Sequence, residues 1–64
     1  MMSITDMMEE AAEALANNEL SSARAWLSEI EAHRQFVSDS EASQLRDLVG
    51  RLRMKHVAIV LASA

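Results

Sequence analysis

Two histidines are the residues best suited to chemistry in this sequence, because a histidine can exchange a proton near neutral pH or bind a metal ion. They stand at His33 and His56, and neither belongs to an HxxxH or HExxH spacing. Glu29 precedes His33 by one helical turn, so a hydrogen bond or weak ion pair between them is expected. An enzyme would need Glu29, His33 and His56 to converge on one pocket. We expect no catalytic residue, no metal site and no cofactor, and we interpret both histidines as packing or interface residues.

The basic stretch RDLVGRLRMKH, residues 46 to 56, is the second candidate, because its bases could contact the phosphates of a nucleic acid. These bases are Arg46, Arg51, Arg53 and Lys55. Asp47 interrupts the run, and no aromatic residue accompanies it to stack on bases. We favour an exposed helix face partly paired with acids of a neighbouring helix. A small nucleic-acid-associated regulator is the alternative.

Charge is distributed unevenly along the 64 residues, whose net charge is −4. Residues 1–45 hold nine acids and two bases, a net charge of −7, whereas residues 46–64 hold one acid and four bases, a net charge of +3. Such asymmetry can guide head-to-tail packing or the choice of partner. The acids of the first half could also imitate nucleic acid, although we favour an ordinary exposed helix face for them.

Composition predicts one small helical domain. The chain has no proline, one glycine and no cysteine, and half of its residues are apolar. Without disulfides or a metal, a fold of this size usually depends on oligomerisation. The sequence has no secretion signal and no apolar run long enough to span a membrane, so we expect a cytoplasmic protein without membrane contact.

Apolar spacing and capping residues predict three helices, over about residues 4–16, 19–36 and 39–62. Ser3 with Asp6, and Ser38 with Glu41, fit the capping box that starts a helix. Asn17-Asn18 fits a helix stop, because asparagine tolerates the left-handed backbone conformation. The predicted fold class is all-α, a helical hairpin plus a third helix, completed as a small bundle by self-association.

The third predicted helix carries one apolar stripe that we expect to form an oligomer interface, with a homodimer favoured. The stripe consists of Leu45, Leu48, Val49, Leu52, His56, Ile59 and Val60. The helix ends in VAIVLA, which is apolar on every face and therefore needs to be covered. A β-strand is the alternative there, since three of these residues are β-branched. Gly50 lies within this pattern. It either lets a neighbouring helix approach closely or is simply an exposed glycine.

Residues 4–37 resemble a single tetratricopeptide repeat. The resemblance rests on Ala11 and Ala23 as the small residues of the two helices, on the Asn18-Glu19 turn, and on Leu20, Leu27 and Ile30. It implies a helical hairpin whose small residues lie where the helices cross, followed by a covering third helix. Generic hairpin packing explains the same residues without any repeat.

The function predicted from these features is non-catalytic binding of another protein, as a small adaptor, chaperone-like subunit or inhibitor. Met7, Met8 and Trp26 are the candidate contact residues, because tryptophan is enriched at binding hot spots and methionine adapts to varied surfaces. For Trp26 we favour packing in the core of the hairpin over contact with a partner. The size and composition also suit accessory proteins that phages or plasmids encode.

Overall fold

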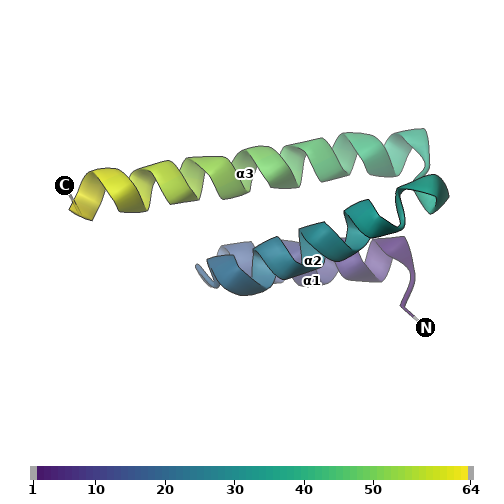
Figure 1. Ribbon diagram of the computed structural model, residues 1–64, viewed down its shortest axis with the longest axis horizontal. Helices are drawn as coiled ribbons and strands as arrows, with labels where there is room; N and C mark the ends of the chain where they lie inside the picture. The colour runs from purple at the N-terminus through teal and green to yellow at the C-terminus, as the bar shows by residue number, and fades with distance from the viewer. Residues whose placement is uncertain (1, 64) are drawn as a thin grey trace.

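The computed structural model describes residues 2–63 and contains three α-helices. Helix α1 spans Ile4–Ala16, α2 spans Leu20–Ala32 and α3 spans Asp39–Ser63, with a short 3-10 turn at Arg34–Phe36 between the last two. Helices α1 and α2 form an antiparallel hairpin, and α3 runs back along it (Figure 1). The all-α fold class with three helices is therefore confirmed.

Both predicted capping boxes are present, and they determine where α1 and α3 begin. The Asp6 N–H donates to Ser3 Oγ at 3.1 Å, while the Ser3 N–H donates to the Asp6 carboxylate at 3.4 Å. Before α3, the Glu41 N–H donates to Ser38 Oγ at 3.2 Å and the Ser38 N–H donates to Glu41 Oε1 at 3.0 Å. The backbone and side-chain hydrogen bonds from Ser38 lower the pKa of the Glu41 carboxyl.

The turn between α1 and α2 uses the left-handed conformation that the asparagine pair predicts. Asn18 has a φ of 59°, which asparagine adopts at lower cost than most residues. Its side-chain oxygen accepts a hydrogen bond from Lys55 Nζ at 2.9 Å. This bond ties the turn of the hairpin to α3 at Lys55, just before the exposed end of that helix.

The second helix ends earlier than the sequence suggests. Its apolar pattern predicts a helix to residue 36, but α2 ends at Ala32. The His33 N–H donates to the Ile30 carbonyl, and the Phe36 N–H donates to the His33 carbonyl. Both hydrogen bonds join residues three positions apart, as in a 3-10 helix, and not four apart as in an α-helix. The chain thereby turns towards the start of α3, and Phe36 leaves the core with 66% of its surface exposed.

Ten buried apolar residues form the core, and only two of them come from α3. They are Met7, Met8, Ala11, Ala14, Leu15, Ala23, Leu27, Ile30, Leu45 and Leu48. Ala11 and Ala23 are completely buried, and such small residues allow two helices to approach closely. The core therefore belongs mainly to the hairpin, and the apolar residues with which α3 covers it end at Leu52.

The length of α3 explains why its end, residues 56–63, is left uncovered by the hairpin. It has 25 residues, whereas α1 and α2 have 13 each. At 1.5 Å per residue, α3 is about 37 Å long and the hairpin helices are about 20 Å long. The last turns of α3 extend past the α1–α2 turn (Figure 1).

Candidate functional site

The predicted oligomer interface is divided by the fold into two parts with different surroundings. Leu45 and Leu48 are 9% and 5% exposed and belong to the core of the same chain, so they are not available to a partner. Val49 and Leu52 pack against that core and are half-buried. His56, Ile59 and Val60 are exposed. The apolar stripe is continuous in sequence, but the hairpin is too short to cover all of it.

The end of α3 presents the largest group of uncovered apolar side chains. Met54, Val57, Ile59, Val60 and Leu61 are between 47% and 71% exposed, and we call these five residues the apolar tail. Every residue from His56 to Ser63 is exposed, and the segment is helical rather than extended. His56 is thus exposed in the single chain, and its place in an oligomer interface stays a prediction.

A groove between α1 and α2 forms a second apolar surface. Trp26 is half-buried in its wall and Phe36 is exposed at its end. We call it the Trp26 groove; it has a volume of about 670 Å³, and its lining includes Ile4, Met7, Ala25, Trp26, His33 and Phe36. These residues come from the hairpin and the 3-10 turn, so the groove lies on a face that α3 does not cover.

The three predicted contact residues have different roles in the structure. Met8 is 4% exposed and Met7 is 8% exposed, so both are core residues of the same chain, and their contact with a partner stays a prediction. Their apolar stripe faces α2 and α3 and is covered by them. Met7 still contributes to the wall of the Trp26 groove. Trp26 remains accessible in that groove, beside Phe36, which the sequence prediction had placed within a longer second helix.

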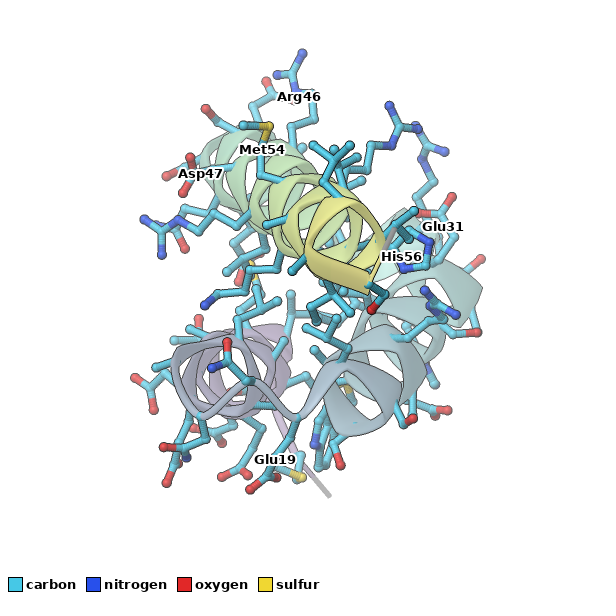
Figure 2. All side chains as sticks on the ribbon, turned by 90° about the vertical axis from the view of Figure 1, so that its left-hand side faces the viewer. Glu19, Glu31, Arg46, Asp47, Met54 and His56 are labelled. Atoms are coloured by element: carbon cyan, nitrogen blue, oxygen red, sulfur yellow. The ribbon has the colours of Figure 1, made fainter. Side chains whose placement is uncertain are left out.

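The histidines do not converge on one pocket. His33 Nδ1 lies 2.9 Å from the Glu29 carbonyl oxygen and 3.7 Å from Glu29 Oε1, so the expected Glu29–His33 contact is present. Both residues line the Trp26 groove, whereas His56 lies on α3 (Figure 2). Within residues 2–63, no group of three or more histidine, aspartate or glutamate side chains could hold a metal ion. The absence of catalysis stays a prediction.

Two of the four basic side chains of α3 form an ion pair or a hydrogen bond with another side chain of the same chain. Arg51 Nη2 lies 2.9 Å from Asp47 Oδ2, and Lys55 Nζ donates to Asn18. Arg46 points away from the hairpin, as does Met54 (Figure 2). Arg46 and Arg53 line a groove that also holds the carboxylates of Glu31 and Asp39. The bases thus alternate with acids and do not form one continuous positive surface.

No protein-family model, no curated protein and no solved structure matches the chain. Among residues 2–63, no helix has both the length and the apolar character needed to cross a bilayer.

Proposed function

We propose that this protein is a non-catalytic protein–protein interaction module that self-associates through the end of α3, acting as a small adaptor, chaperone-like subunit or inhibitor. The observation that supports this proposal is the apolar tail, whose five side chains are roughly half to two-thirds exposed along a helix that leaves the hairpin. Apolar side chains gathered in this way on a small protein mark a surface that another molecule covers.

The area left exposed on the tail is large enough to influence association but too small to drive it alone. Full burial of a Val, Leu, Ile or Met side chain contributes about 1.5–3 kcal/mol. Covering the exposed part of five such side chains would contribute on the order of 5 kcal/mol. Because association costs about 4–15 kcal/mol, the partner surface also has to be apolar. A second copy of the chain would supply such a surface.

A triple substitution in the tail tests the proposal. We expect Val57→Gln, Val60→Gln and Leu61→Gln in one chain to abolish self-association and leave a monomer of 7.1 kDa. Glutamine favours helix at least as well as valine, so the helix is retained while its apolar surface is lost. The measurement is solution mass by sedimentation over a wide concentration range, with helicity followed by circular dichroism.

A matched control places glutamines on exposed positions outside the tail. Ala16 and Ala32 are exposed at the ends of α1 and α2. The variant with Ala16→Gln and Ala32→Gln should associate like the unchanged chain. Equal masses for the unchanged chain and the triple variant at every concentration would refute the proposal.

A further inference from the structure

The apolar tail and the Trp26 groove are two uncovered apolar surfaces at opposite ends of the molecule. We infer that the tail of one copy docks into the Trp26 groove of a second copy. This inference rests on the proposed self-association and specifies which surface of the partner the tail covers. The alternative contact between copies would place two tails against each other.

Charge distinguishes these two contacts. Residues 50–63 carry three cations, Arg51, Arg53 and Lys55, and no acid. The hairpin, residues 4–36, carries seven carboxylates against two arginines, a net charge of −5. Arg51 is paired with Asp47, so two tails side by side would bring together the like charges of Arg53 and Lys55 from each copy, whereas a tail beside the hairpin brings opposite charges together. At separations within the Debye length, this difference favours the groove.

The groove itself offers both an apolar floor and an acidic edge. Trp26 and Phe36 present aromatic surface, and Phe36 is 66% exposed. The Glu29 side chain in the wall is 55% exposed and lies 3.7 Å from His33, so it is accessible to a cation of an incoming helix. Large aromatic side chains contribute most of the binding energy at many interfaces. The end of α3 is apolar on all faces, so it can present apolar side chains to the groove in any rotation about its axis.

The two surfaces are placed so that one chain cannot satisfy both within itself. The tail extends past the α1–α2 turn, while the groove lies near the start of α1 and the 3-10 turn, at the opposite end of the long axis (Figure 1). That axis measures 40 Å. A contact between two different surfaces is heterologous, and it continues from copy to copy unless a ring closes. Assemblies should therefore grow beyond the dimer as concentration rises.

Disulfide trapping tests the contact directly, because the chain contains no cysteine. One preparation carries Val60→Cys and the other Phe36→Cys, both at exposed positions. We expect the mixed disulfide to predominate when the two are oxidised together, as identified by mass spectrometry. A predominance of the Val60→Cys homodisulfide would overturn the groove contact and leave the proposed self-association intact. If the unchanged chain has the mass of a monomer at all concentrations, both the groove contact and the proposed self-association are wrong.

A pair of charge reversals provides a second measurement. Glu29→Lys changes the wall of the groove, whereas Glu13→Lys makes the same change of net charge at an exposed position of α1 outside its lining. We expect Glu29→Lys to weaken association much more than Glu13→Lys, and we expect the unchanged chain to associate more weakly at about 0.5 M salt than at about 20 mM. Equal effects of the two reversals, or association that strengthens with salt as for two like-charged tails, would overturn the inference.

Discussion

Gly50 lies in the interior of α3, and its replacement by alanine tests whether the helix is open on that side in solution. The residue is exposed, and a Cβ built on it meets no heavy atom within 4 Å. Its φ is not positive, so an L side chain fits the backbone without strain. Glycine in a helix interior is about 1 kcal/mol less favourable than alanine. We therefore expect Gly50→Ala to raise the free energy of unfolding by about 1 kcal/mol.

In a domain of this size, about 1 kcal/mol corresponds to a rise of roughly 4–8 °C in Tm. The assay is thermal unfolding followed by circular dichroism, repeated with urea and at two protein concentrations so that association is separated from folding. Gly50→Val is the matched control, because valine also fits the open space but favours helix less, giving a gain of about 0.4 kcal/mol. A loss of stability in Gly50→Ala would refute this reasoning, since it would mean that another backbone lies against α3 at this position.

Two further predictions concern the core and the start of α3. Ile30 is completely buried, so Ile30→Ala should lower the free energy of unfolding by about 2–5 kcal/mol. Val60→Ala, at an exposed position, should change it by less than about 0.5 kcal/mol. Both variants are measured by urea unfolding at low concentration, where the chain is monomeric, and equal losses of stability would contradict the fold. The Ser38 hydrogen bonds that lower the pKa of Glu41 stabilise the folded chain above the unfolded pKa of about 4.3. That stabilisation is lost as pH falls through the lower folded pKa. Glu41→Gln should therefore flatten the acid limb of the stability curve, and an unchanged limb would show that the capping carboxylate contributes nothing.

Local features of the sequence predicted most of the helix boundaries. The capping boxes at Ser3 and Ser38 act within four residues, and the left-handed turn at Asn18 depends on one side chain. Ala11 and Ala23, which the sequence resemblance marked as the small residues of the two hairpin helices, are core residues. These features could be read from the sequence because each depends on residues only a few positions apart.

The division of the α3 stripe could not be predicted in the same way. Leu48 and Val60 occupy the same stripe in sequence, yet Leu48 is core and Val60 is exposed. The difference depends on where the hairpin ends along α3, which is a property of tertiary packing. The Trp26 groove was missed for a related reason. Trp26 and His33 are seven residues apart and share a helix face, but Phe36 joins them only because α2 ends early at Ala32.

The central claim, self-association through the exposed end of α3, is tested most directly by the solution mass of the unchanged chain across a wide concentration range. We predict a mass that rises above the 7.1 kDa of the monomer and keeps rising past the dimer, with the emission of Trp26, the only tryptophan, shifting to the blue in parallel. A constant mass of 7.1 kDa with full helicity at every concentration would contradict the account.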